Sequence, residues 1–385
     1  MTDSLRTRLR TGLHRALRDG RLGPLPLTPL TWAARADRDQ WQALAAYRGL
    51  VHQAFAGRPL APQVCTDLWE NGVFRSSADR EAFFSPALRE LENSSHHYGH
   101  DVQLKRHAGL PLIGPPLPWL LEHGLKVSRM ASFERPRPWS RGYLCMGPLR
   151  AKWLEERFGL PAVPIGPWIL YARPLLDATE IERLRADLGR TLLVVLAHSW
   201  DQVERRMDRR ICVDAVAALA ATEGYRSVIW LRHWQDPAVE GLPLHWIVAC
   251  NGHRSNPWFL DAMHTLLSLS DGLATNAFGT HLGYGVALGL RVHWVLVDVE
   301  QDLSRMSTEK AAEEREEWQN RQRLSAEVVA ALRHDQSGSD CPPNSQQALR
   351  QLLDPFWGFD CMKAPSALAA LLRRAPRIGA ISAGG

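Results

Sequence analysis

The sequence has few cysteines and no long apolar run. Its six cysteines, among 385 residues, are scattered, with no Cys-x-x-Cys pair and no cluster of cysteine with histidine. This spacing argues against a disulfide framework and against a structural zinc site. No apolar stretch reaches the roughly 18–20 residues that a membrane-spanning helix needs. The N-terminal stretch has arginines where a signal peptide has its apolar region, so we expect no signal peptide and a cytoplasmic location.

Charge of one sign is not in large excess, but it is unevenly distributed. Residues 1–175 contain 24 Lys and Arg against 15 Asp and Glu, and the remaining residues contain 22 against 26. A basic first half indicates an anionic partner, such as a phosphorylated substrate or a lipid surface. We expect no nucleic-acid partner, because helix-turn-helix, zinc-finger and RNP patterns are missing and aromatic residues do not alternate with the basic ones.

The length of the chain and its pattern of residues predict several parts. A chain of 43.3 kDa is long enough for two domains. We expect a basic amphipathic helix over 1–22, an N-terminal α/β domain over 23–175, a C-terminal Rossmann-like domain over 176–335, and a loop with closing helices over 336–385. In residues 1–22 leucines recur at fourfold spacing among arginines. Such a helix could lie on an anionic membrane surface, on the inner face of the membrane, or pack on the body of the protein, and the sequence leaves both open.

The second half has the pattern of a parallel sheet. Continuous apolar runs predict strands buried on both faces, over Thr191–Ala197, Ser227–Arg232, His245–Cys250, Gly272–Thr275 and Val292–Asp298. The segments between them predict helices over Val203–Thr222, Pro257–Leu269 and Thr280–Leu288, and a long charged helix follows over Ser307–His334. Strands and helices that alternate in this way indicate an α/β fold with a parallel, doubly wound sheet. The first half offers three short extended segments, Pro118–His123, Gly142–Met146 and Ala162–Ile165.

A glycine-rich segment lies between a predicted strand and a predicted helix. Its candidate ligand-binding residues are Asn276, Gly279, Thr280, His281, Gly283 and Tyr284. Small residues let the backbone approach a phosphate, and the N-terminus of a helix supplies unpaired N–H groups. Thr280 and His281 add side-chain donors. The same glycines would also permit close packing of the helix on the sheet, so both interpretations stay open.

Polar residues follow the other predicted strands as well. His198, Ser199 and Trp200 come after the first strand, His233 and Trp234 after the second, and His253 and Arg254 after the third. In a doubly wound sheet these loops fall on the edge that carries the glycine-rich segment, so we expect them to converge on one cleft. Arg254 and His253 are candidates for phosphate contacts, and the tryptophans could stack on a base or a sugar.

The order of these segments resembles a known family. The stretch from Ser270 to Gly289, S-D-G-L-A-T-N-x-F-G-T-H-x-G-Y-x-x-x-L-G, is similar to the donor-binding segment of GT-B glycosyltransferases of bacterial surface-polysaccharide synthesis. A second segment, from Tyr98 to Asp101 and on to Pro111, is similar to uncharacterised proteins of polysaccharide gene clusters. The resemblance implies two Rossmann-like domains. The C-terminal one would bind a nucleotide-sugar donor and the N-terminal one a glycan or lipid-linked acceptor.

Such a transferase needs a base for the acceptor hydroxyl, and Asp101 and His123 are the candidates. We expect neither a metal nor a cofactor other than the nucleotide-sugar substrate, since His96, His97 and His100 lack the glutamate of an H-E-x-x-H helix. Two other functions remain open. One is a sugar-nucleotide epimerase or polyol-phosphate transferase of similar fold, and the other is a non-catalytic protein that binds sugar or lipid.

Overall fold

The computed structural model describes residues 98–333 and 343–373, with gaps at 114–116, 123, 132–133, 135, 137–139, 201–202, 234–235, 237–240 and 252–257. Several predictions fall outside the described residues. These are the helix over 1–22 and the residues His96, His97, His123, Trp234, His253 and Arg254.

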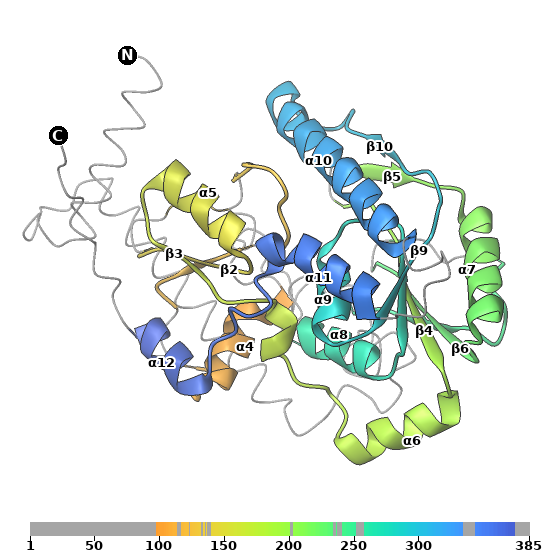
Figure 1. Ribbon diagram of the computed structural model, residues 1–385. Helices are drawn as coiled ribbons and strands as arrows, with labels where there is room; N and C mark the ends of the chain where they lie inside the picture. The colour runs from red at the N-terminus through yellow and green to blue at the C-terminus, as the bar shows by residue number, and fades with distance from the viewer. Residues whose placement is uncertain are drawn as a thin grey trace, which may run out of the picture.

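A five-stranded parallel sheet forms the centre of the second half (Figure 1). Its strands are β4 (Thr191–Val195), β6 (Ser227–Leu231), β7 (Ile247–Ala249), β8 (Gly272–Thr275) and β9 (Arg291–Trp294). They lie in the order β7-β6-β4-β8-β9. Numbered along the chain within the sheet, this order is 3-2-1-4-5, which is the order of a doubly wound sheet. The predicted parallel sheet is therefore confirmed, and the strand order reverses between β4 and β8.

Helices cover both faces of this sheet. Side chains alternate between the two faces along each strand, and the apolar ones on each face pack against helices. Leu193 and Ile229 point to the face covered by α8 (Phe259–Ser268) and α9 (Thr280–Ala287). Leu192 and Val228 point to the opposite face, where α7 (Arg209–Glu223) packs. Figure 1 shows α7 on one side of the strands and α8 and α9 on the other. The continuous apolar runs of the sequence follow from this burial on both faces.

One predicted helix begins too early. We predicted a helix from Val203, but residues Glu204–Arg206 form strand β5, and α7 begins at Arg209. The Asp208 carboxylate fixes that start by accepting hydrogen bonds from the amides of Arg210 (2.9 Å) and Ile211 (3.1 Å). β5 pairs antiparallel with β10 (Glu300–Asp302). The last predicted strand, Val292–Asp298, was also too long, because β9 ends at Trp294.

The first half contains a small parallel sheet within the described residues. Its strands are β1 (Leu120–Leu121), β2 (Tyr143–Cys145) and β3 (Ala162–Pro164), in that order. Each lies within a predicted extended segment. Beside the sheet lie α4 (His100–His107) and α5 (Pro148–Phe158), and the 3-10 helix η2 (Trp168–Tyr171) follows β3. Helix α6 (Ala178–Leu188) lies at the large sheet, where Arg185 pairs with Asp271.

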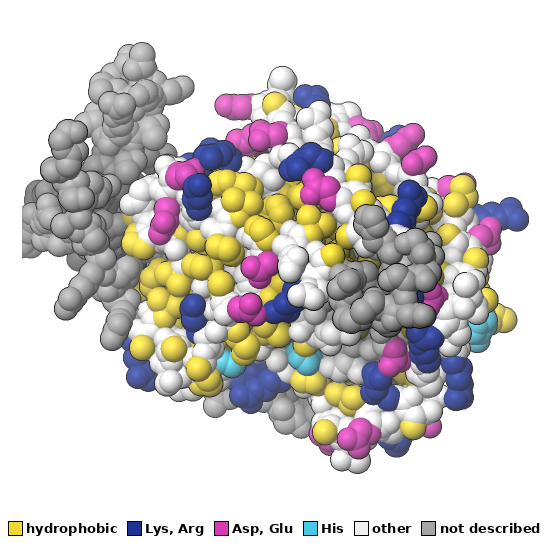
Figure 2. Space-filling view, in the orientation of Figure 1, with side chains coloured by type: hydrophobic (Ala, Val, Ile, Leu, Met, Phe, Trp, Pro, Cys, Tyr) yellow, Lys and Arg dark blue, Asp and Glu magenta, His cyan; other side chains and the backbone are white. Residues whose placement is uncertain are grey.

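Three helices complete the described C-terminal part of the chain. They are α10 (Thr308–Arg333), α11 (Pro343–Trp357) and α12 (Pro365–Arg373), and α11 packs on α5, α9 and α10. The largest hydrophobic cluster accordingly includes Leu121 and Leu144 of the small sheet, Leu193 of the large one and Trp357 of α11. In Figure 2 acidic and basic side chains are mixed along α10. Among the described residues no helix is both long enough and apolar enough to cross a membrane.

Candidate functional site

The site lies where the strand order of the large sheet reverses. β4 and β8 are neighbours there, and their following loops diverge to opposite faces. The Asn276 side chain joins the two strand ends, because its Oδ1 accepts a hydrogen bond from the Ala197 amide at 2.8 Å. Asn276 is buried and keeps the two loops in fixed positions relative to each other. Open α/β sheets bind their ligands beyond the carboxyl ends of the strands, at the point where the strand order reverses.

The predicted helix start after β8 is present. Gly279 precedes α9 and provides no side-chain cap, so the first N–H groups of the helix are left to other partners. A Cβ atom on Gly279 would lie 2.6 Å from Cε1 of His281, which explains the glycine by a close approach of the imidazole. The His281 Nε2 lies 2.7 Å from the Thr275 hydroxyl. Burial, together with His198 and Arg321, lowers the pKa of His281 to about 3, so the ring is neutral at pH 7.

The loops after β4 and β6 converge as predicted. The imidazoles of His198 and His233 stack in parallel, with ring centres 4.2 Å apart and planes 7° apart. Burial lowers the pKa of His198, and Arg205 adds to that effect. Ser199 accepts a hydrogen bond from the Arg205 amide at 3.0 Å, and the backbone groups of Trp200 and Val203 exchange two hydrogen bonds. The loop after β7, which holds His253 and Arg254, lies outside the described residues.

Sequence reasoning missed Arg205, which is a cation inside this region. Its guanidinium lies over the Trp318 ring at 4.9 Å, and Glu314 Oε1 is 3.9 Å from a terminal nitrogen. Among the described residues its Nε has no hydrogen-bond partner. Burial, followed by the charge of Arg321, lowers the pKa of Arg205 to about 10. Glu314 and Glu317 oppose these effects, so the guanidinium stays charged at pH 7. We predicted a helix over this segment. In strand β5 the two neighbouring side chains instead point to opposite sides, so that Arg205 is 12% exposed and Arg206 is 59% exposed.

Two residues of α10, also missed, bring the small sheet to the site. Arg321 donates hydrogen bonds to the carbonyl oxygens of Phe278, just before α9, and of Leu125 (2.6 Å), just after β1. Glu317 accepts from the Val127 amide (3.1 Å) and the Ser128 hydroxyl (2.6 Å). Burial raises the pKa of Glu317, but Arg321, Lys126 and these hydrogen bonds lower it to about 2. The loop after β1 thus lies against the start of α9.

Three predicted residues lie apart from these contacts. Gly283 faces Trp357 of α11, and a Cβ atom there would overlap the indole, so this glycine permits helix packing. Tyr284 is buried, and burial raises the pKa of its hydroxyl well above the usual range. Asp101 is 4% exposed on α4, which packs on η2 and α12, and its charge raises the pKa of Lys105 against the larger effect of burial.

Comparison with known proteins adds no identity. No protein-family model matches the sequence. No curated protein matches it either. The interpretation of the site therefore depends on its geometry and chemistry.

The arrangement is suited to binding an anion next to a planar or hydroxylated group. Arg205 offers donor atoms in a partly dry environment, and the uncapped start of α9 adds the positive end of a helix dipole. The neutral rings of His198 and His281 can exchange hydrogen bonds without adding charge. Among the described residues, no group of three His, Cys, Asp or Glu side chains could hold a metal ion.

Proposed function

We propose that this chain is a glycosyltransferase of GT-B type that binds a nucleotide-sugar donor at the β4–β8 crevice. The observation that carries the proposal is the position of Arg205, a cation with a side chain 12% exposed and an ion pair of 3.9 Å to Glu314, beside the loop of His198 and Ser199. A nucleoside diphosphate would supply a negative charge to this cation. The surface-polysaccharide role implied by the sequence resemblance belongs to the same proposal.

The two parallel sheets would divide the reaction between them. The large sheet holds the donor, and the loop after β1 offers the acceptor side, since the Leu125 amide and the Thr280 hydroxyl are in contact. Of the two base candidates we keep His123 for this role. The residue that follows it, Gly124, lies beside Thr280, so that a Cβ atom there would be 3.7 Å from the Thr280 hydroxyl. Asp101 lies on the buried helix α4 instead.

The transfer breaks the bond between the anomeric carbon and the phosphate oxygen, and forms one to the acceptor oxygen. Negative charge builds on the departing nucleotide diphosphate, and the acceptor hydroxyl gives up its proton to the base. Arg205 and the start of α9 would stabilise the leaving diphosphate, because fixed charges and dipoles act strongly where water is excluded.

The test is a thermal-shift and calorimetric screen with UDP, GDP, CMP, CDP and their common sugar conjugates. Arg205→Gln should weaken binding of the recognised nucleotide by at least about tenfold. Its ligand-free stability should fall, because the substitution also removes the contacts of the guanidinium with the Trp318 ring and the Glu314 carboxylate, so unfolding of the free protein is measured beside binding. Arg206→Gln is the matched control, since Arg206 is the next residue of β5 and its side chain, 59% exposed, pairs with Glu204 and Asp302.

The outcomes separate the alternatives. Binding that depends on Arg205 and not on Arg206, with sugar transfer to a glycan or lipid acceptor, supports the proposal. Binding without turnover favours the non-catalytic interpretation, and conversion of the donor sugar without transfer favours an epimerase. If no nucleotide binds, the donor-site proposal is wrong.

A further inference from the structure

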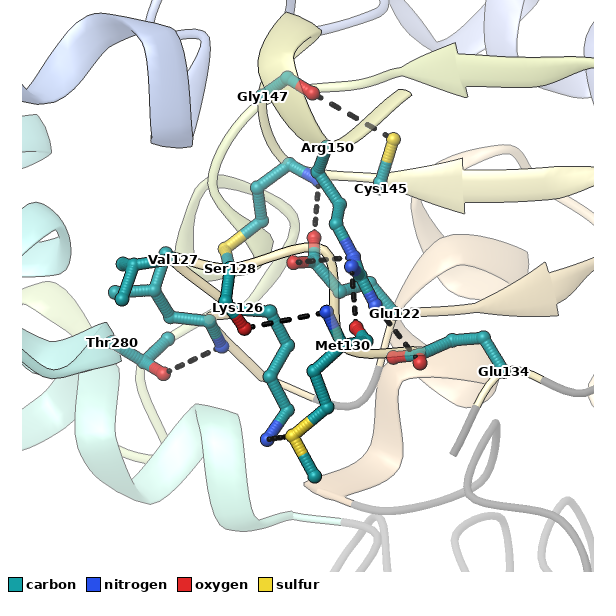
Figure 3. Close-up of polar contacts among 12 residues, drawn as sticks. Glu122, Lys126, Val127, Ser128, Met130, Glu134, Cys145, Gly147, Arg150 and Thr280 are labelled. Atoms are coloured by element: carbon teal, nitrogen blue, oxygen red, sulfur yellow. Dashed lines mark hydrogen bonds and ion pairs between the residues drawn. The ribbon is translucent and has the colours of Figure 1, made fainter. Parts of the chain in front are cut away.

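A buried group of three charged side chains holds two points of the loop between β1 and β2, Glu122 and Glu134, to Arg150 of α5 (Figure 3). Arg150 of α5 lies 3.8 Å from the carboxylate of Glu122, the first residue of the loop, and 2.9 Å from that of Glu134, further along it. Arg150 also donates a hydrogen bond to the Met130 carbonyl at 2.8 Å. The Glu122 carboxylate accepts a hydrogen bond from the Met146 amide, at the end of β2, at 2.9 Å. One arginine therefore contacts the loop at Glu122, Met130 and Glu134.

The middle of the same loop carries the contacts to the proposed donor site. The amide of Leu125 meets Thr280 at the start of α9, and Val127 and Ser128 meet Glu317 of α10. The first part of the loop is thus held by Arg150, which belongs to the helix after β2, and by Thr280 and Glu317, which belong to helices after β8 and β9. Glu122 and Leu125 are three positions apart, so a displacement of the Glu122 backbone would also displace Leu125.

The charge of this group is unbalanced. Two carboxylates face one guanidinium, and the exposed fractions of the three side chains are 0–1%. Burial raises the pKa of Glu122 to about 7, while Arg150 and the Met146 amide oppose that effect and Glu134 adds to it. The other titratable groups that face Glu122 are Cys145 of β2 and Tyr284 of α9, and burial keeps both uncharged. Glu122 is therefore the group here whose charge changes near neutral pH.

We propose that Glu122 and Arg150 are positioning residues, which hold the loop after β1 against the start of α9 with a strength set by one proton on Glu122. The consequence for ligand binding rests on the proposed function. The effect on the loop itself does not, because it follows from the contacts of the ligand-free protein.

The direction of the proton effect follows from the burial of Glu122. Opening of the loop hydrates the carboxyl group and returns its pKa towards the ordinary 4.5. Between pH 4.5 and 7 the closed loop keeps the proton and the open loop loses it, so opening releases a proton and becomes easier as the pH rises. Above pH 7 both forms are ionised and the effect levels off.

Amide hydrogen exchange of residues 124–130 tests the proposal directly. Protection is measured from about pH 5 to about pH 7.5 in the wild type, in Glu122→Gln and in Glu156→Gln, after correction for intrinsic exchange rates. The amide side chain introduced by Glu122→Gln keeps an oxygen for the Met146 amide but cannot ionise. We expect the ratio of protection in Glu122→Gln to that in the wild type to grow by up to about fiftyfold over this range. Contributions from histidines are common to both proteins and cancel in the ratio.

Two further variants make the result specific. Glu156→Gln is the matched control, because it breaks an exposed pair between α5 and Arg129 of the same loop, and it should keep the wild-type pH profile. Glu134→Gln should shift the wild-type profile to lower pH, since the Glu134 charge raises the pKa of Glu122. A protection ratio that does not change with pH would overturn the proposal, as would an unshifted profile in Glu134→Gln.

Nucleotide titrations at about pH 5.5 and about pH 7.5 form a separate arm. If a nucleotide binds, its affinity should depend less on pH in Glu122→Gln than in the wild type. If no nucleotide binds to any of these proteins, the proposed function fails while the exchange result still decides the role of Glu122 and Arg150. Equal pH dependence of a measurable affinity in both proteins would contradict the link between the loop and the ligand.

Discussion

The Thr280 hydroxyl accepts a hydrogen bond from the Leu125 amide at 3.3 Å, and this contact joins residues 155 positions apart. It brings the end of β1 in the small sheet to the first turn of α9 in the large sheet. Arg321 strengthens the same junction by binding the carbonyl oxygens of Phe278 and Leu125. A ligand at the start of α9 would therefore contact a surface to which both halves of the chain contribute.

The Thr280 hydroxyl should matter more than the shape of its side chain. Thr280→Val keeps the volume but leaves the Leu125 amide without this acceptor, so we expect a loss of about 1 kcal/mol in the free energy of unfolding. Thr280→Ser should retain most of the wild-type stability. Urea unfolding of both variants measures the difference, and equal losses would contradict a special role for the hydroxyl.

Gly283 should be required for packing. Gly283→Ala places a methyl group on the Trp357 indole, and we expect destabilisation of about 1–3 kcal/mol from overpacking. The cost should be smaller in a Trp357→Phe background, where the smaller ring leaves room. A double-mutant cycle measured by chemical unfolding gives this coupling. Additive costs would show that Gly283 is needed for another reason.

Breaking the Glu317 contacts should strongly destabilise the junction. Glu317→Gln removes a buried carboxylate that pairs with Arg321 at 2.8 Å and accepts from Ser128 and Val127, so we expect a loss of roughly 3 kcal/mol. Arg323→Gln serves as the control on the same helix. It breaks an exposed pair with Glu327 and should change the free energy of unfolding by less than about 0.5 kcal/mol. Similar effects of both variants would exclude a special role for Glu317.

His281 should make the protein less stable in acid. Its pKa is about 3 when folded and near 6.5 when unfolded, so the unfolded chain binds a proton that the folded one does not. Stability from this group is present above pH 6.5 and is lost as the pH falls towards 3. His281→Gln should remove about 2 kcal/mol of the difference in stability between about pH 6.5 and about pH 4.5. Unfolding curves of both proteins at these pH values test this, and parallel curves would contradict the buried neutral imidazole.

The two base candidates should behave differently. His123→Asn should lower sugar transfer by about a hundredfold or more while nucleotide binding remains. Asp101→Asn should change stability more than transfer, because Asp101 is buried on α4 beside Lys105. Steady-state kinetics with separate binding measurements distinguish these effects. A large loss of transfer in Asp101→Asn alone would reverse the assignment.

Most of the large sheet could be predicted because its pattern is local. Thr191–Val195 and Ser227–Leu231 are largely apolar, since each strand has helices over both faces. The predicted helix start at Thr280 also agrees with the structure, because a glycine preceding a polar residue marks such a boundary. The short strand β5 was missed, since three charged residues in a row, Glu204–Arg206, give no apolar period.

The sequence by itself determined which segments become buried parallel strands and which loops follow them. Only the tertiary structure decided which residues meet there. It placed Gly283 against Trp357, the Arg205 guanidinium over the Trp318 ring, and Arg321 between Phe278 and Leu125. These pairs are distant in sequence or lie on different elements, so no local period encodes them. Their charges and pKa values depend on burial and on neighbours, and both are properties of the folded chain alone.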